Sequence, residues 1–222
     1  MKIKVISTWN DKLFKEYAHR FQKTYNWPFD LEIFDDEDLY DIPSFKKFVD
    51  RNKVDIPLDY RKDAVRFSYK VYAYTQSILT TKGYDGIIFI DADSVFYKKI
   101  DAKWIEKNIY KEGHMISYLG RPTEYSECGF IFFNMKHPFI KQFAYDMRKM
   151  YDEELLFKEE QQHDSWIFDV VRKNLEEKYG VLNHSIGDGR VGHVQARSIL
   201  GRVYDHTKGA RKKTGKSKES SL

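Results

Sequence analysis

GIIFIDADSVFYKKI, residues 86–100, places two aspartates directly after a run of apolar residues. The run begins at a glycine and is almost continuously apolar, which predicts a central strand covered on both faces of a sheet. Residues two apart in an extended chain project to the same side, so the side chains of Asp91 and Asp93 are expected to face one point at the end of this strand. A divalent cation that prefers oxygen ligands, Mg²⁺ or Mn²⁺, would offset the repulsion between them. The competing interpretation is that both aspartates cap a helix or accept backbone hydrogen bonds in a turn.

Hydrophobic patterns on both sides of this segment predict alternating strands and helices. We expect strands at residues 2–8, 30–34, 86–90, 114–119 and 129–134. We expect helices at residues 11–24, 44–51, 63–81, 139–151 and 163–177, and a loop between the second strand and residue 41. This order predicts an α/β fold with a central, mostly parallel sheet flanked by helices. Ligands of such sheets lie at the carboxyl ends of the strands, where Asp91 and Asp93 are expected.

The length and composition of the chain indicate one globular domain. Its 222 residues are 41% hydrophobic and 32% charged, and the sequence contains no internal repeat and no linker rich in Gly, Ser or Pro. The net charge is +4, but the segment from Arg202 onward has seven basic and two acidic residues, which leaves 31 basic and 32 acidic residues for the rest. We therefore expect a domain at residues 1–213 and a basic, disordered tail at residues 214–222.

The sequence also bears on the cellular compartment. No apolar run approaches the length needed to cross a bilayer, and the first residues lack the apolar stretch and cleavage site of a signal peptide. Cys128 is the single cysteine, so it cannot form an internal disulfide, which is consistent with a reducing compartment and argues against a zinc-finger or redox role. We expect a cytoplasmic protein without a membrane span.

Four short blocks, in this order along the chain, resemble those of glycosyltransferases of the GT-A fold. IIFIDAD, residues 87–93, resembles their DxD motif, and ECGFIFFNM, residues 127–135, resembles an Asn/Ser-Gly pair before an apolar strand. QQHDSWIFDVV, residues 161–171, resembles a block in which a polar Asp opens a helix. VYDHTKGARKK, residues 203–213, resembles the terminal block of the glycogenin-like, retaining group. The resemblance covers residues 2–213 and implies a single GT-A (Rossmann-like) domain.

The resemblance also implies a reaction, a donor substrate and a metal. In this family the DxD carboxylates hold a metal against the diphosphate of a nucleotide sugar, and a histidine, a glycine three residues on and a lysine three residues further close the site. His206, Gly209 and Lys212 keep that spacing. The chain is thus expected to be a hexosyl- or pentosyltransferase that uses a nucleotide-diphosphate sugar together with Mn²⁺ or Mg²⁺. The implied metal ligands are Asp91, Asp93 and His206, and Ala92 between the aspartates belongs to the implied donor site.

The chemistry of the terminal block fits this interpretation. A histidine nitrogen added to carboxylate oxygens shifts the preference of a site from Mg²⁺ toward Mn²⁺. Lys208, Gly209 and Lys212 are suited to neutralise a diphosphate, because glycine lets its backbone amide approach an anion closely. The alternative is that these lysines belong to a solvated basic tail. The chain departs from the group in having Thr207 where an aromatic residue usually follows the histidine, and in lacking Pro-Trp after Lys212.

Further candidates for the donor site lie upstream of the aspartates. Arg66 and Lys70 share one face of the expected helix with Asp63, and similar helices in GT-A enzymes contribute a basic residue to the nucleotide or sugar. The alternative is a surface ion-pair ladder. Ser7 and Thr8 end the first expected strand, where this fold receives the nucleoside, although both residues also suit a turn.

The stereochemistry of the reaction stays open from the sequence. In a retaining enzyme that resembles glycogenin, the leaving phosphate takes the acceptor proton, and Lys212 shares the charge that develops on the leaving group. In an inverting enzyme a carboxylate must take the proton, and Asp164 is the candidate, although it also suits the N-cap of its helix. His184 and His193, in a glycine-rich stretch, are further candidates for contact with the substrate.

Two other classes of function compete with glycosyl transfer. A nucleotidyltransferase also binds Mg²⁺ and a triphosphate with paired carboxylates, but ISTWNDK, residues 6–12, lacks the glycine-rich phosphate loop of such enzymes. A nucleic-acid-binding protein without catalysis would need a broad basic face, which the nearly neutral residues before Arg202 do not supply. The acceptor is left open between a glycan, a small molecule and a modified DNA base, to which the basic tail would bring the enzyme.

Overall fold

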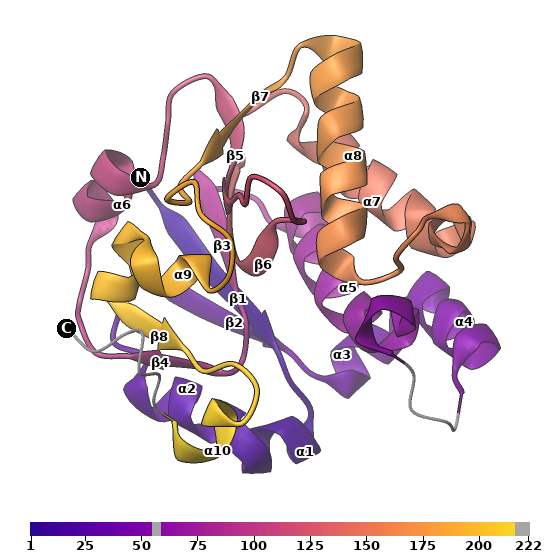
Figure 1. Cartoon of the computed structure of the whole chain (residues 1–222), viewed down its shortest axis with the longest axis horizontal. Helices are drawn as coiled ribbons and strands as arrows, with labels where there is room; N and C mark the ends of the chain where they lie inside the picture. The colour runs from indigo at the N-terminus through magenta and orange to yellow at the C-terminus, as the bar shows by residue number, and fades with distance from the viewer. Residues whose placement is uncertain (55–58, 216–222) are drawn as a thin grey trace.

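A six-stranded sheet in the order β2-β1-β3-β6-β5-β7 runs through the protein (Figure 1). The structure is a computed structural model that describes residues 1–54 and 59–215. The strands are β1 (Ile3–Thr8), β2 (Asp30–Phe34), β3 (Gly86–Ile90), β5 (His114–Leu119), β6 (Glu127–Asn134) and β7 (Leu182–Ser185). β6 is antiparallel to both of its neighbours, and the other pairs are parallel. The expected α/β fold with a mostly parallel sheet is confirmed.

β3 is the central strand, and its side chains divide between two cores. All five of its residues are buried, because helices or loops cover both faces of the sheet. Ile87 and Phe89 belong to one core cluster, and Ile88 and Ile90 belong to the other. This alternation explains why the strand is apolar throughout, since residues of opposite parity face opposite sides and both sides are buried.

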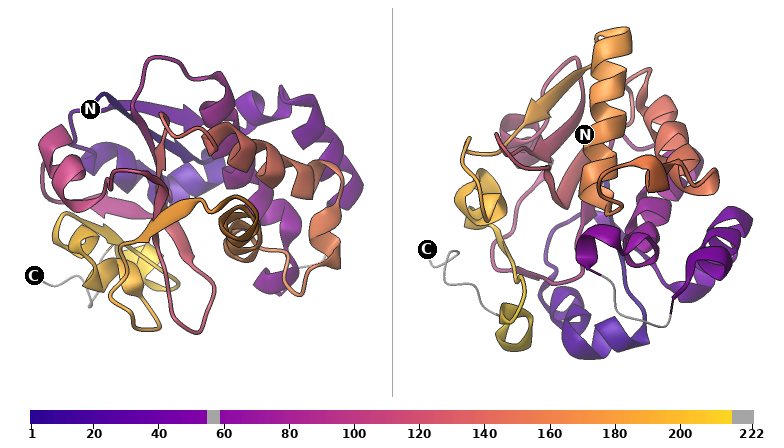
Figure 2. Two further views of the ribbon diagram at one scale, coloured as in Figure 1. Left: turned by 90° about the horizontal axis from the view of Figure 1, so that it is seen from above. Right: turned by 45° about the vertical axis from the view of Figure 1, so that its right-hand side comes forward.

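Four long helices cover one face of the sheet. They are α4 (Pro43–Asn52), α5 (Ala64–Thr80), α7 (Ile140–Asp152) and α8 (Asp164–Tyr179). Their apolar side chains, such as Val71 and Phe143, pack with Ile87 and Phe89. The opposite face is covered by α2 (His19–Thr24), α6 (Ala102–Asn108) and the C-terminal segment, drawn in yellow, which lies across the sheet from α8 (Figure 2).

The first expected helix has an irregular centre. Residues 11–24 form α1 (Asp11–Leu13), a π-helical turn at Phe14–Ala18, and α2. Asn10 caps the start of this segment, because its side chain accepts a hydrogen bond from the backbone N–H of Leu13 (3.0 Å). The apolar spacing could not show the π turn, which changes the phase of the helix by one residue within the segment.

One expectation about the chain between residues 35 and 41 is wrong. This acidic stretch forms the helix α3 (Asp36–Tyr40) and not a loop. Asp35 and Asp38 form a capping box, in which each side chain accepts a hydrogen bond from the backbone N–H of the other (3.0 and 3.2 Å). Reciprocal capping together with acidic residues in the first turn stabilises a helix that apolar periodicity alone does not reveal.

Several short elements of the structure were not among the expected ones. They are the helix α6 and the strand β7, together with β4 (Ser94–Phe96), β8 (Tyr204–His206), α9 (Val194–Arg197), α10 (Arg211–Thr214), and 3-10 turns at Tyr60–Lys62, Leu155–Lys158 and Ile199–Arg202. β4 and β8 form a separate two-stranded antiparallel sheet. This pairing matters for the site because it places His206 opposite Ser94, directly after the two aspartates.

The described chain ends in a short helix and its cap. Residues 211–214 form α10, and Gly215 caps this helix in the left-handed conformation (φ +67°). The tail expected at residues 214–222 lies, from residue 216 on, outside the described residues. Among the described helices, none combines the length and apolar character that a bilayer-spanning segment requires.

Phe96 is expected to hold the β4–β8 sheet in place. Its fully packed ring contacts Phe21, Trp27 and Tyr204 with centroid distances of 4.8, 4.9 and 5.6 Å. We expect Phe96→Ala to lower the free energy of unfolding by about 3–5 kcal/mol, because it leaves a cavity among these rings. Denaturant-induced unfolding followed by circular dichroism measures the loss.

Tyr145→Ala is the control for this substitution, because the Tyr145 side chain on α7 is 57% exposed. It should change the free energy of unfolding by less than about 0.5 kcal/mol. Equal effects of the two substitutions would show that the aromatic cluster does not stabilise the fold.

Candidate functional site

Asp91 and Asp93 lie at the carboxyl end of β3, between β6 and the C-terminal segment. The backbone N–H of Asp91 donates to the carbonyl of Gly129 (3.1 Å). The carbonyl of Asp93 accepts hydrogen bonds from the backbone N–H and the hydroxyl of Thr207 (3.0 and 2.6 Å). Because the strand β4 follows directly, neither aspartate caps a helix, and both carboxylates are directed to side chains of distant segments.

His206 reaches the two aspartates from β8. Its Nε2 atom lies 3.0 Å from Oδ1 of Asp93 and 3.5 Å from Oδ2 of Asp91. Gly129 leaves room for the ring, because a Cβ atom at this position would lie 2.5 Å from Cε1 of His206 and 3.3 Å from Oδ2 of Asp91. The glycine of the ECGFIFFNM block is therefore required by a close side-chain approach and not by its backbone conformation.

Three lysines, Lys70, Lys208 and Lys212, form ion pairs with the carboxylates of the site. The ammonium group of Lys70, on α5, lies 2.9 Å from Asp91 and 2.9 Å from Asp164. The Lys212 ammonium lies 2.8 Å from Asp93. These ion pairs join the aspartates of the expected metal site to lysines that were expected to contact the donor substrate.

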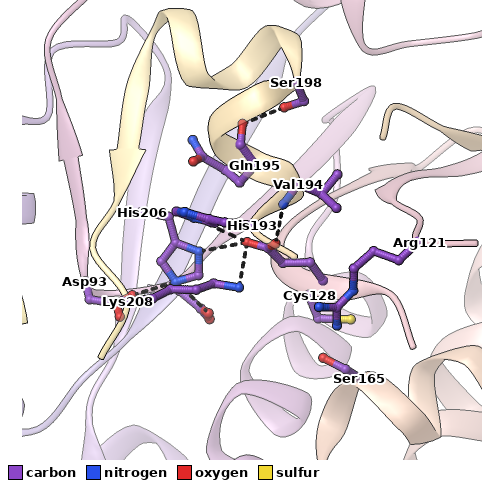
Figure 3. Close-up of polar contacts among 12 residues, drawn as sticks. Asp93, Arg121, Cys128, Ser165, His193, Val194, Gln195, Ser198, His206 and Lys208 are labelled. Atoms are coloured by element: carbon purple, nitrogen blue, oxygen red, sulfur yellow. Dashed lines mark hydrogen bonds and ion pairs between the residues drawn. The ribbon is translucent and has the colours of Figure 1, made fainter. Parts of the chain in front are cut away.

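Glu127 is a fourth carboxylate of the site, to which sequence reasoning assigned no role. It opens β6, is 3% exposed, and lies 3.2 Å from Nδ1 of His206 and 2.9 Å from the ammonium of Lys208. The backbone N–H of Val194 donates to its other oxygen (3.1 Å). In Figure 3, where Glu127 is not labelled, the dashed lines from the labelled His206, Lys208 and Val194 mark these contacts. The sequence feature that could have pointed to a role for Glu127 is its position as a charged residue at the start of a strand whose next residues are apolar.

The electrostatics of this cluster follow from buried charges in contact. Burial alone would raise the pKa of Asp93, but His206 and Lys212 hold it well below its usual range. Burial opposes protonation of His206, but Asp93 and Glu127 raise its pKa to about 9. Burial would raise the pKa of Glu127, but His206 and Lys208 lower it well below its usual range. In the metal-free protein, protonated His206 and the three lysines therefore balance the four acids.

The donor atoms of Asp91, Asp93 and His206 fit a divalent cation. One carboxylate oxygen from each aspartate and one imidazole nitrogen lie within 4.8 Å of one another. Two oxygens and one nitrogen form a donor set that suits Mn²⁺. Glu127, His193 and His206 form a second group of this kind, in which all three residues are buried.

A cleft of about 760 Å³ opens beside the aspartates. The expected site residues that line it are Thr8, Arg66, Lys70, Asp91, Ala92, Asp93, Gly209 and Lys212. Trp9, Asn10, Lys12 and Tyr17, from the segment after β1, line the same cleft. Most residues that were expected to bind a donor substrate thus face one cavity. A smaller cleft of about 460 Å³ lies elsewhere, beside α6, and contains none of them.

Some expected site residues lie outside this cleft. Ser7 is fully buried and its hydroxyl donates to the carbonyl of Ile90 (2.6 Å), so it braces β1 against β3. Lys208 turns toward Glu127, and Asp164 lies behind Lys70. His184 lies on β7 near the carbonyl of Ile109 (3.2 Å), whereas His193 lies 3.8 Å from Glu127.

Two capping roles differ from those expected. Asp164 is the first residue of α8, and His163 is its N-cap, because Nδ1 of His163 accepts a hydrogen bond from the backbone N–H of Trp166 (3.4 Å). Asp63 caps α5 by accepting from the backbone N–H of Arg66 (3.2 Å). The sequence left a surface ion-pair ladder on α5 as an alternative; in the structure Asp63 caps this helix, and Lys70 pairs with Asp91 and Asp164.

Comparisons with known proteins give the fold. No known protein-family model matches this chain, and no curated protein matches it in sequence. The structure is similar to that of a glycosyltransferase involved in the glycosylation of the major capsid of PBCV-1, with a TM-score of 0.52 over 97% of this chain and 98% of that chain at 8% identity. Mouse xyloside xylosyltransferase 1, in its apo form, matches 84% of this chain and 86% of its own at 12% identity and a TM-score of 0.47. The WbbM bifunctional glycosyltransferase matches 76% of this chain, which spans 37% of WbbM, at 13% identity and a TM-score of 0.47. The first of these likenesses shows that the chain has the fold of that capsid-modifying glycosyltransferase.

The raised pKa of His206 predicts how the stability of the metal-free protein depends on pH. A histidine whose pKa is about 9 in the folded state and about 6.5 in the unfolded state stabilises the fold fully below pH 6.5, and this stabilisation is lost as pH rises through 9. We expect the free energy of unfolding in EDTA to fall by on the order of 3 kcal/mol across this range.

His206→Gln should remove this part of the pH dependence, because glutamine does not titrate. Urea unfolding of both proteins at a series of pH values between 6 and 10 gives the comparison. A wild-type slope that persists unchanged in the variant would contradict the assignment of the raised pKa to His206.

Proposed function

We propose that the protein is a metal-dependent glycosyltransferase, which moves a sugar from a nucleotide-diphosphate sugar to an acceptor hydroxyl. The observation that carries the proposal is the convergence of Asp91, Asp93 and His206 at the end of the central strand, beside a cleft lined by basic and aromatic residues. The fold likeness to a glycosyltransferase supports it. So do the four sequence blocks that resemble the GT-A family, because the structure brings residues of all four to one place.

The metal site of the proposal consists of Asp91, Asp93 and His206, with Mn²⁺ favoured over Mg²⁺ by the imidazole nitrogen. When bound, the ion supplies Lewis-acid stabilisation to the departing diphosphate. His206 must give up its Nε2 proton to the solvent to offer a lone pair, so metal binding is coupled to deprotonation. Lys212 then no longer serves as the counter-charge of Asp93 and is available to an anionic ligand.

Lys212, Lys208 and Gly209 form the proposed diphosphate contact. Lys212 and Gly209 line the cleft, and Gly209 has a left-handed backbone (φ +56°) that directs its amide without a side chain in the way. Lys208 lies one residue before this turn and pairs with Glu127 at 2.9 Å, so it adds positive charge near the proposed diphosphate while it stays bound to that carboxylate. Charge on the leaving group would be shared between these lysines.

The nucleoside is placed at the end of the cleft formed by the segment after β1. Thr8 lies there, and its hydroxyl donates to the carbonyl of Phe34 (2.8 Å), which leaves its oxygen to accept a hydrogen bond. Trp9 and Tyr17 provide ring surfaces in the same cleft, and Arg66 provides a cation. Aromatic and cationic groups of this kind suit a nucleobase and a phosphate.

The environment of Asp164 supports a retaining reaction. An inverting enzyme needs a carboxylate that accepts the acceptor proton. Asp164 is 2% exposed, and its carboxylate is bound by the Lys70 ammonium at 2.9 Å. A carboxylate that is buried, bound by an ammonium and absent from the lining of the cleft is poorly placed to take a proton from an acceptor hydroxyl, so the leaving phosphate is the better proton acceptor. Asp164 is then assigned to holding Lys70 in the cleft.

Asp93→Asn tests the metal assignment. We expect donor hydrolysis in Mn²⁺, measured across a panel of sugar nucleotides, to fall by about 100-fold or more, because the variant loses several kcal/mol of charge stabilisation. Asp101→Asn is the matched control, since Asp101 is an exposed aspartate that caps α6 outside the cleft. Wild-type hydrolysis by Asp93→Asn would overturn the metal site.

Two neighbouring lysines provide a second test of the proposal. Lys212→Met should reduce donor hydrolysis about 10- to 100-fold, because the departing diphosphate loses a cation in the cleft. Lys213→Met should stay within about twofold of wild type, because Lys213 is an exposed lysine that does not line the cleft. Equal losses in both variants would indicate general attraction by the basic segment instead of a specific contact.

A further inference from the structure

We propose that Glu127 is a positioning residue, which holds the imidazole of His206 so that its Nε2 atom faces Asp91 and Asp93. The proposal rests on the metal site of the proposed function and adds a residue to it. The two ring nitrogens of His206 are engaged on opposite sides, with Nδ1 3.2 Å from Glu127 and Nε2 3.0 Å from Asp93. The orientation of the ring is thus fixed by two carboxylates from different strands.

The carboxylate of Glu127 is itself held rigidly. Glu127 is one of the eight residues of β6, all of which are buried. A charged carboxylate is stable in such a place only where opposite charges and hydrogen bonds offset the cost of its burial. The backbone N–H of Val194 donates to Oε2, and the Lys208 ammonium lies 2.9 Å from Oε1. The oxygen that faces His206 therefore has little freedom to move, which is what a positioning residue requires.

The protonation of the imidazole explains why this position matters. A neutral imidazole carries one N–H donor and one lone pair, and the hydrogen bond at one nitrogen determines which nitrogen keeps the lone pair. A proton on Nδ1 that is donated to Glu127 leaves the lone pair on Nε2, directed at the two aspartates. Without this acceptor, the proton can move to Nε2 and bind Asp93, and no nitrogen ligand then remains for a metal. Histidine ligands of metals are commonly held in this way by a carboxylate.

A second interpretation assigns Glu127 itself to a cation, together with His193 and His206. The ligand atoms of these three residues also lie within 4.8 Å of one another. The cleft argues against it, because Asp91 and Asp93 line this cavity whereas Glu127 and His193 do not. The positioning role is therefore favoured, and the two interpretations predict opposite results for the variants below.

Glu127→Gln and Glu127→Asp separate the hydrogen bond from the charge. Glutamine removes the charge but keeps one acceptor oxygen at the same length, while its NH2 group replaces the oxygen that accepts from the Val194 N–H. Aspartate keeps the charge but withdraws the acceptor by one methylene group. Isothermal titration calorimetry of the full chain with Mn²⁺ and with Mg²⁺, in the absence of any nucleotide, measures both affinities.

A positioning role predicts that the acceptor matters more than the charge. Glu127→Gln should keep the wild-type preference for Mn²⁺ over Mg²⁺ within about threefold, because His206 still presents Nε2. Glu127→Asp should lose about 10- to 100-fold in Mn²⁺ affinity and less in Mg²⁺ affinity, because the nitrogen ligand favours Mn²⁺. Glu127→Met, which has the length of glutamine without its acceptor, should behave like the aspartate variant and replaces it if the aspartate variant does not fold.

Arg148→Met controls for a loss of stability alone. Arg148 is buried between α5 and α7, where it donates to Thr75 (2.6 Å) and Gln76 (2.8 Å), and it does not line the cleft. This variant should be less stable and should keep the wild-type ratio of the two metal affinities.

Three results would overturn the proposal. If Glu127→Asp retains the Mn²⁺ preference and Glu127→Gln loses it, Glu127 acts through its charge or as a ligand itself. If both variants keep the wild-type affinities, Glu127 has no role at the metal. If the wild-type chain does not bind Mn²⁺, the metal assignment of the proposed function fails as well, and this outcome is distinguished from the other two by the wild-type titration alone.

Discussion

Four carboxylates converge at the carboxyl end of β3, and the surrounding structure is organised to neutralise them. Three of them, Asp93, Glu127 and Asp164, are almost completely buried, where an uncompensated charge costs several kcal/mol. Their counter-charges come from α5, from β8 and from the segment after it, so no single part of the chain forms the site. The N-terminal and C-terminal parts of the domain are thus tied together by a charge balance as well as by the two hydrophobic cores.

The negative charge of Asp93 can be balanced in two ways. In the metal-free protein the charge of Asp93 is met by protonated His206 and by Lys212. In the proposed function, a divalent cation held by Asp91, Asp93 and His206 would replace the proton on Nε2 of His206 and the Lys212 ammonium as the counter-charge of Asp93. Lys212, which lines the cleft, would then be available to an anionic ligand such as a diphosphate. Metal and donor binding are therefore expected to assist each other.

Much of the fold follows from the pattern of the sequence, because long elements with strong periodicity determine it. The apolar run before Asp91 indicates a buried central strand, and the spacing of Val65, Tyr69 and Tyr72 indicates the helix that packs on it. β4 and β8 were not found, because each has only three residues and their pairing joins segments that are far apart in the chain. The capping box of α3 was present in the sequence at Asp35 and Asp38, but the acidic composition of the stretch obscured it.

Residue type and spacing in the sequence identified some of the residues that meet at the candidate site. The ion pairs of Lys70 with Asp91 and of Lys212 with Asp93 bring together residues that were singled out from the sequence, and His206 was singled out from a family block; their roles stay predictions. Ser7 and Thr8 could not be told apart, because adjacent residues of a strand face opposite sides and the sequence does not show which side is open. The contact of Glu127 with His206 depends on the register between β6 and a distant segment, which spacing does not encode.

The most direct test of the central claim is the anomalous scattering of Mn²⁺ in a crystal of the protein with a nucleoside diphosphate. The account predicts one strong peak bound by Asp91, Asp93 and the Nε2 atom of His206, with the diphosphate between this ion and Lys212. An ion on the other side of the imidazole, between Glu127 and His193, or no ion at the end of β3, would contradict it.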